Sequence, residues 1–256
     1  MNTHLRTQTS EIGSDREVSG GGFGWERLQK LAAIGVLVSF VAPMVIDLSL
    51  EPFLLSMAAP FAIGLLLAVR WRRVAAIWLG IVSLAVLLFS LPFLGEVLIH
   101  PESAGDFIPL SLFTFGSVVG AAAAVPAFRE IRGGGGQSHS PRRIATASTA
   151  LFLAATAWSV VALVELEDAS PQPGDVLLTT EDFAFNPIGV SAAAGTISMA
   201  VTNQDNTRHT FTITELGVDL SVPPGTTQRV TFTAEPGTYT FFCNPHPDMQ
   251  GQLVAG

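Results

Sequence analysis

The sequence predicts two structural classes in one chain, an all-α membrane region of five helices followed by an all-β sandwich. The 256 residues are 48% hydrophobic and only 13% charged, whereas an average soluble domain is about 25% charged. Nearly all of the hydrophobicity up to residue 166 comes in long runs, and the residues beyond it alternate apolar and polar types. One part of the chain therefore suits lipid and the other suits water.

Five runs are long enough to cross a bilayer, which takes about 20 mainly apolar residues in a helix. The expected helices are Leu31 to Leu50, Pro52 to Val69, Val74 to Ile99, Ile108 to Phe128 and Ile144 to Leu166. The second run is the shortest, so a buried soluble helix is the alternative for it. The polar residues before the first run are too many for a signal peptide, so we expect residues 31–166 to form a retained five-helix region.

The basic residues of this region predict its orientation. They are Arg6, Arg16, Arg27 and Lys30 before the first helix, Arg70, Arg72 and Arg73 between the second and third, and Arg129, Arg132, Arg142 and Arg143 between the fourth and fifth. The other two loops contain none. Because Lys and Arg stay on the cytoplasmic side, we expect a cytoplasmic N-terminus and an extracytoplasmic C-terminal domain. Residues 1–30, whose first two dozen are rich in Ser, Thr and Gly, are expected to form a disordered cytoplasmic tail.

Ionisable groups cluster at the opposite ends of the helices. They are Asp47, Glu51, Glu96, His100, Glu102 and Asp106. Such groups at helix ends are typical of the water boundary, and a cation or proton entry site is the alternative. No helix carries a histidine near its middle, so ligation of haem by paired histidines is not supported. The role of the helices beyond anchoring stays open.

After Leu166 the pattern changes to a polar, Pro-containing linker at 167–174 and then to a β-rich domain at 175–256. The domain consists of short β-branched or alternating stretches separated by Gly and Pro turns, which is typical of a β-sandwich. The expected strands are Val176 to Thr180, Ile188 to Ser191, Ile197 to Thr202, Thr210 to Thr214, Thr226 to Thr233, Thr238 to Phe242 and Gln252 to Val254.

Residues of types that bind metals lie just before the last of these stretches and at the start of an earlier one. Cys243, His246 and Met249 follow one another at a spacing of three, and His209 opens a strand earlier in the domain. Two imidazoles and a thiolate with a distant thioether are the donors of a blue-copper electron-transfer site. A structural zinc site would use Cys and His without a thioether. Cys243 is the only cysteine of the chain, so it has no partner for a disulfide, and the alternative for it is a small buried apolar residue.

At these residues the sequence resembles the cupredoxins, the group of plastocyanin, amicyanin and pseudoazurin. Phe183 to Pro187 is similar to the family's early F-x-F-x-P strand, and the stretch from Gly195 to Asn203 to the approach to the first copper histidine. Gly237 to Cys243 is similar to the G-x-Y-x-F/Y-x-C strand, and the short loop from Cys243 to Met249 to that of amicyanin-like members. The resemblance covers about residues 174–256.

The resemblance implies a cupredoxin-like Greek-key sandwich in which His209, Cys243, His246 and Met249 bind one copper ion. The family often has Asn after the first His and Ser or Thr after the Cys, whereas this chain has Thr210 and Asn244. A hydrogen bond between the two segments survives if donor and acceptor types are exchanged.

The resemblance also suggests the route of the electrons. In related proteins the histidine of the C-terminal ligand loop reaches the surface through an apolar patch, and here Pro245 and Pro247 flank His246. We therefore expect electrons to pass through the imidazole edge of His246.

Composition narrows the function further. A net charge of −8 argues against nucleic acid as a partner. A dinuclear copper site would need a second cysteine, and a copper enzyme would need more histidines than His4, His100 and His139. We therefore expect one-electron transfer at the outer face of the membrane rather than catalysis, with copper carriage or sensing as the alternative. From residue 169 onward the chain has eight acidic residues against two arginines. This excess would steer a basic redox partner near the membrane, such as a cytochrome or an oxidase, towards the domain, and plain solubility is the alternative explanation for it.

Overall fold

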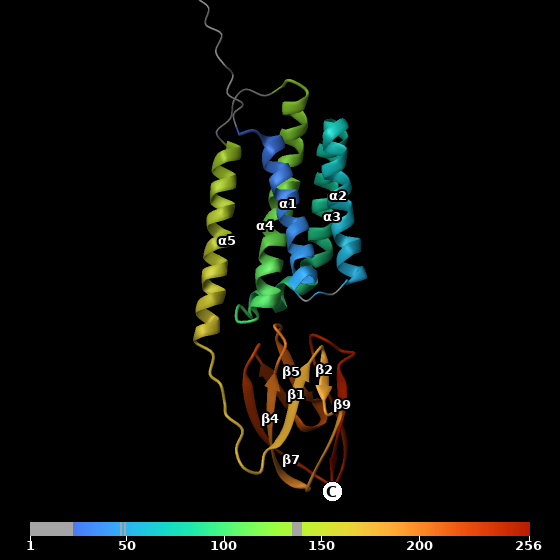
Figure 1. Ribbon diagram of the computed structural model, residues 1–256, viewed down its shortest axis with the longest axis vertical. Helices are drawn as coiled ribbons and strands as arrows, with labels where there is room; N and C mark the ends of the chain where they lie inside the picture. Colours follow the sequence, from blue (N-terminus) through green and yellow to red (C-terminus); the bar gives the residue numbers. More distant parts are fainter. Residues whose placement is uncertain (1–22, 47, 49, 135–139) are drawn as a thin grey trace, which may run out of the picture.

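The computed structural model describes residues 23–46, 48, 50–134 and 140–256, so most of the expected tail, together with Asp47 and His139, lies outside the described residues. The described chain forms five α-helices and then nine β-strands (Figure 1). The helices are α1 (Trp25–Ile46), α2 (Pro52–Arg70), α3 (Arg72–Leu98), α4 (Ala104–Ile131) and α5 (Ser140–Val164).

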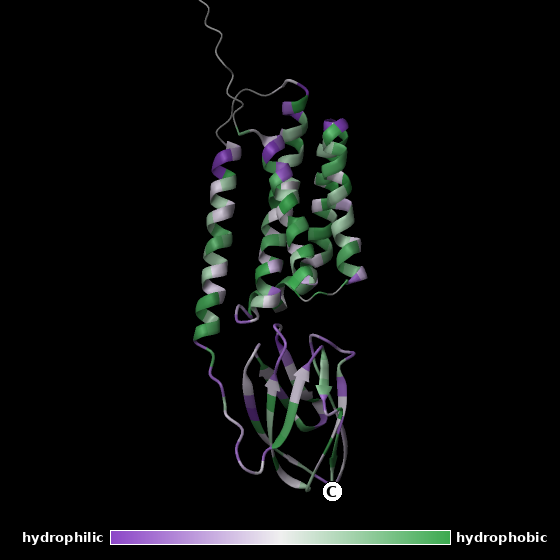
Figure 2. Ribbon diagram, viewed as in Figure 1, coloured by the Kyte–Doolittle hydropathy of each residue, from purple (hydrophilic) through white to green (hydrophobic). Residues whose placement is uncertain are grey.

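All five helices are long and apolar enough to cross a membrane, and Figure 2 shows their mainly hydrophobic surfaces with polar residues at the ends. Helix α4 lies beside α1, α3 and α5, and small residues allow the close approach. A Cβ added at Gly116 would lie 2.7 Å from Val36 Cγ2, and one added at Gly120 would lie 2.6 Å from Ser83 Oγ. Small residues at helix contacts are typical of membrane bundles, where lipid gives no hydrophobic drive to association.

Helix α1 begins at Trp25, earlier than the expected Leu31. The carboxylate of Glu130 explains the longer helix, because it accepts hydrogen bonds from the backbone N–H groups of Trp25 (2.6 Å) and Glu26 (3.2 Å). A carboxylate at a helix N-terminus satisfies free donors and complements the helix dipole. The ion pair between Glu26 and Lys30 (2.7 Å) then joins residues one turn apart.

The C-terminal part is a sandwich of two sheets, with strand orders β2-β1-β4-β7 and β3-β9-β8-β5-β6. The strands are β1 (Val176–Glu181), β2 (Ala184–Asn186), β3 (Gly189–Ala192), β4 (Gly195–Asn203), β5 (His209–Ile213), β6 (Val218–Val222), β7 (Thr227–Ala234), β8 (Gly237–Phe242) and β9 (Gln250–Ala255). Seven of these coincide with the expected strands to within a few residues, β2 lies within the strand motif Phe183 to Pro187, and β6 is additional.

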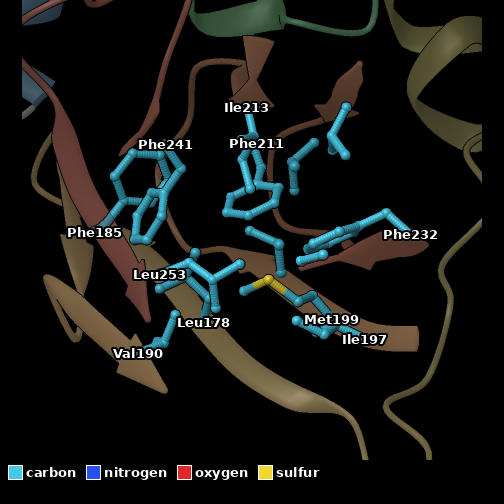
Figure 3. Close-up of a cluster of buried hydrophobic side chains, with 14 of the residues drawn as sticks. Leu178, Phe185, Val190, Ile197, Met199, Phe211, Ile213, Phe232, Phe241 and Leu253 are labelled. Carbon is cyan, nitrogen blue, oxygen red and sulfur yellow. The ribbon is translucent and has the colours of Figure 1, made fainter. Parts of the chain in front are cut away.

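Aromatic side chains from both sheets fill the space between them (Figure 3). The ring of Phe241 lies 4.9 Å from that of Phe185 and 5.2 Å from that of Phe211, measured between centroids. A Cβ added at Gly251 would lie 2.3 Å from the Phe241 ring, so this position of β9 needs glycine. The packing fixes the ends of β5 and β8, from which the site described below projects.

The segment that the sequence marks as a linker is bound along the edge strand β7. Ala169 N–H donates to Thr227 O (2.8 Å), and Thr227 N–H donates to Asp168 Oδ1 (2.7 Å). The Gln228 amide adds a bond to Glu167 O (2.7 Å). The sandwich is therefore held by chain that leaves the membrane only a few residues earlier, and the linker gives it less reach than its length implies.

A second attachment joins the sandwich to the loop between α3 and α4. Arg208 N–H donates to Ser103 Oγ (2.9 Å), whose hydroxyl donates to Asp106 Oδ2 (2.7 Å). A Cβ added at Gly105 would lie 2.3 Å from Asn206 O, so the loop between β4 and β5 rests directly on this glycine. The end of the sandwich that carries this loop therefore faces the helices (Figure 1).

Candidate metal centre

Two neighbouring strands deliver the first two predicted ligands. His209 is the first residue of β5, and Cys243 directly follows β8; both are fully buried. The two strands pair in the five-stranded sheet, with Thr212 opposite Phe242. Residues far apart in sequence therefore meet at one end of the sandwich.

The loop between β8 and β9 delivers the other two. It is closed by three backbone hydrogen bonds, from Cys243 N–H to Met249 O (3.0 Å), from His246 N–H to Cys243 O (3.2 Å) and from Met249 N–H to His246 O (2.9 Å). Pro245 and Pro247 lack backbone donors and restrict the chain further. This loop holds His246 half-buried and Met249 3% exposed within the same apolar core as Cys243.

Three donor atoms converge at this end. Cys243 Sγ lies 3.5 Å from Nδ1 of His209 and 3.5 Å from Nδ1 of His246, and the two Nδ1 atoms are 3.2 Å apart. The centre of a triangle with these sides lies about 2 Å from each corner, which is close to ordinary metal–imidazole and metal–thiolate bond lengths. Among the described residues this is the only group of three or more His, Cys, Asp or Glu side chains close enough to share a metal ion. The residues present thus fit a metal with trigonal His-His-Cys ligation.

Asp205 holds the outer side of the first imidazole. Its Oδ2 lies 2.7 Å from His209 Nε2, the ring nitrogen opposite the triangle. The same carboxylate accepts hydrogen bonds from the N–H groups of Asp182 (2.8 Å) and Phe183 (3.2 Å) in the turn between β1 and β2. Such a carboxylate behind a ligating histidine fixes the ring orientation and its tautomer.

Phe183 is the second residue that this network positions. Its backbone has a positive φ of 58°, unusual for an aromatic residue. Its ring meets the rings of His209 and His246 edge-on, with centroids 5.7 and 4.9 Å away, although 52% of the side chain is exposed. The sequence did not reveal that Asp205 and Phe183 contact the two histidines. It placed Phe183 only in a strand motif and counted Asp205 only among the acidic residues of the domain.

Thr210 and Asn244, which follow His209 and Cys243, connect the two segments by hydrogen bonds, as expected. Asn244 N–H donates to Thr210 Oγ1 (2.8 Å), and Asn244 Nδ2 donates to Thr212 Oγ1 (3.2 Å). Thr210 N–H points at Cys243 Sγ (3.4 Å). Hydrogen bonds to a thiolate favour its charged form and tune a bound metal.

Burial disfavours the charged forms of Cys243 and His246. It raises the pKa of the Cys243 thiol, and the hydrogen bonds from Thr210 and His246 oppose this only in part. It also lowers the pKa of His246 to about 4, with the nearby His209 acting in the same direction. A neutral imidazole offers its lone pair directly, and metal binding releases the thiol proton.

Among the described residues, the ionisable groups at the helix ends near the sandwich form local pairs. His100 Nδ1 lies 2.8 Å from Glu102 Oε1, and Asp106 accepts from Ser103. The side chain of Glu96, like Asp47, lies outside the described residues.

The family model of the cupredoxin-like domain matches residues 149–255. The C-terminal part of this chain is a cupredoxin-like domain. Among solved structures, a reduced mutant of amicyanin has 17% identity and a TM-score of 0.31, with 34% of this chain and 87% of that chain covered. The amicyanin of Paracoccus versutus has 18% identity and a TM-score of 0.30, with 34% and 86% covered. No curated protein matches the chain.

Proposed function

We propose that this membrane protein carries single electrons through one copper ion held by His209, Cys243, His246 and Met249. The triangle of donor atoms with sides of 3.2 to 3.5 Å is the observation that carries the proposal. The membership of the domain in a family of copper-binding electron-transfer modules supports it.

When bound there, copper supplies a centre that alternates between Cu(I) and Cu(II). The chain itself contributes a rigid set of ligands. Cys243 Sγ and the two Nδ1 atoms lie close together, and Met249 is buried in the same apolar core as Cys243. Asp205 keeps His209 oriented, so neither oxidation state has to reorganise the surroundings.

Copper carriage is the alternative, and the packing argues against it. A carrier must release its ion to an acceptor, whereas His209 and Cys243 are 0% exposed and the ligand loop is closed by three backbone bonds. Of the three convergent donors, only His246 is partly open to solvent, which suits passage of an electron better than exit of an ion.

The location of this activity follows from the loop charges. We propose that the copper domain lies outside the cytoplasm, because the described basic residues of the helical region occur at the ends of the helices away from the sandwich (Figure 1). The partner is a redox protein at the same membrane surface, and the excess of acidic residues in the domain favours a basic one. In this arrangement the chain acts as a carrier, and catalysis belongs to its partners.

The experiment is copper loading of the full chain in detergent. Cu(II) should give an intense visible thiolate-to-copper band, Cys243→Ser should abolish it, and Met249→Leu should weaken it less while raising the reduction potential. Met199→Leu is a matched control, because Met199 is equally buried in β4 of the same core but is not a predicted ligand. A colourless tetragonal Cu(II) complex, or loading by zinc alone, would refute the assignment.

A further inference from the structure

Helices α3 and α4 form an apolar groove of about 550 Å³ on the wall of the bundle. Gly80 and Ala124 bring the two helices together, since a Cβ added at Gly80 would lie 2.4 Å from Ala124 Cβ. The remaining apolar lining residues are Ile77, Ile81, Leu84, Ala121, Val125 and Phe128. Ile81 is 63% exposed and Val125 58% exposed, so in a bilayer this groove opens to lipid.

One end of the groove is basic. Arg129 and Arg132 line it at the end of α4 that lies away from the sandwich, and Arg73 stands one turn before Ile77 on the same face of α3. The Arg132 guanidinium lies 5.4 Å from the centroid of the Phe128 ring. Among the described residues, no acidic side chain forms an ion pair with Arg129 or Arg132.

The nearest acid in sequence is turned away from these arginines. Glu130 lies between them in the chain, but its carboxylate accepts the backbone N–H groups of Trp25 and Glu26 at the start of α1. The groove is therefore an apolar channel whose basic end has no acidic partner among the described residues, and this end lies where the helices end.

We propose that this groove binds one anionic phospholipid, with an acyl chain along α3 and α4 and its phosphate at Arg129 and Arg132. Basic pockets between transmembrane helices on the cytoplasmic side suit anionic headgroups, and guanidinium groups bind phosphate with two parallel hydrogen bonds. A neutral phospholipid offers the same chain without net charge, and free phosphate offers the charge without the chain. The inference is independent of the copper site.

The test uses the full chain in mild detergent, with retained lipid measured by native mass spectrometry. Phosphatidylglycerol should be retained in preference to phosphatidylcholine of the same chain composition. The double change Arg129→Gln/Arg132→Gln should weaken phosphatidylglycerol binding by about 25-fold, at roughly fivefold for each arginine. The matched control Arg27→Gln/Arg70→Gln removes the same charge from α1 and α2 at the same end of the bundle, away from the groove, and should have little effect.

A second pair of variants tests the groove itself. Ala121→Phe should fill it and weaken retention, whereas Ala154→Phe, on an exposed face of α5, should not. Equal retention of the two lipids, or equal loss in the two arginine double variants, would overturn the proposal. If lipid retention falls in the groove arginine variant but not in Ala121→Phe, the lipid is attracted only by surface charge, and the proposal is overturned. Displacement of the lipid by inorganic phosphate at the same concentration would lead to the same conclusion.

Discussion

Asp205 should be the residue outside the predicted ligands on which the copper end of the domain most depends. Its side chain is only 12% exposed and accepts from His209 Nε2 at 2.7 Å and from two backbone N–H groups of the neighbouring turn. The turn with these two N–H groups is already exposed, so in Asp205→Ala water can take the place of the carboxylate as their acceptor at little cost. His209 is fully buried, and a buried donor left without a partner costs about 1–3 kcal/mol.

We therefore expect Asp205→Ala to lower the free energy of unfolding by about 1–3 kcal/mol, the cost of leaving the buried His209 donor without a partner. Asp205→Asn keeps an acceptor for His209 and should cost about 1 kcal/mol. Asp182→Asn removes one negative charge from the turn that Asp205 contacts, but the Asp182 side chain accepts no described hydrogen bond, so the free energy of unfolding should change by no more than about 0.5 kcal/mol. In the copper-loaded protein Asp205→Asn should raise the reduction potential, because a nearby negative charge stabilises Cu(II) more than Cu(I).

The assay is chemical denaturation of a metal-free fragment spanning residues 167–256, which keeps the bonds between the linker and β7. Met249 and Cys243 remain in place, so each copper-loaded variant can be compared by its potential as well. If Asp205→Ala unfolds at the same denaturant concentration as the wild type, the carboxylate does not hold His209. If Asp182→Asn shifts the potential as far as Asp205→Asn does, the contact with His209 has no special electrostatic role.

Two further predictions concern pH and orientation. Burial lowers the pKa of His246 to about 4, below the value of about 6.5 in the unfolded chain, so the unfolded state takes up the proton first as the pH falls. The free energy of unfolding of the metal-free domain should therefore be highest above about pH 6.5 and decrease towards pH 4. An NMR titration of the His246 ring with a midpoint near 6.5 would contradict this. Reporter fusions at Gly134 and Gly256 should report opposite sides of the membrane, and agreement between them would mean that the number of crossings is wrong.

Most of the fold could be predicted because its signals are local. Runs of apolar residues mark the helices, and alternation between Gly and Pro turns marks most strands. Strand β2 is only three residues long and was expected only through the resemblance, within Phe183 to Pro187. Strand β6 (Val218–Val222) alternates strictly between apolar and polar residues, but it is short and ends directly before Pro223, and it was not among the expected strands. These two strands gain their stability from pairing with β1 and β5, which a single stretch of sequence does not reveal.

The convergence of Cys243 and His246 was predictable for a similar reason, since the spacing of three residues between them is visible in the sequence. The supporting contacts were not. Asp205 reaches Phe183 and His209 only because two loops meet in space. Likewise, the composition of residues 167–169 does not distinguish a free linker from one that is hydrogen-bonded to β7. Contacts between loops depend on tertiary structure, and their residue types are those of any polar surface.

The attachment at Gly105 and Ser103 has a kinetic consequence for an electron carrier. The linker bound to β7 and the loop beneath Asn206 and Arg208 hold the domain at two points, so the copper end cannot swing from a donor to an acceptor. The helices cover the side of the domain near His209. Electron uptake and electron release would therefore both use the side that carries Phe183, His246 and Pro247. Donor and acceptor must then occupy the same surface in turn, and each should act as a competitive inhibitor of the other in steady-state turnover.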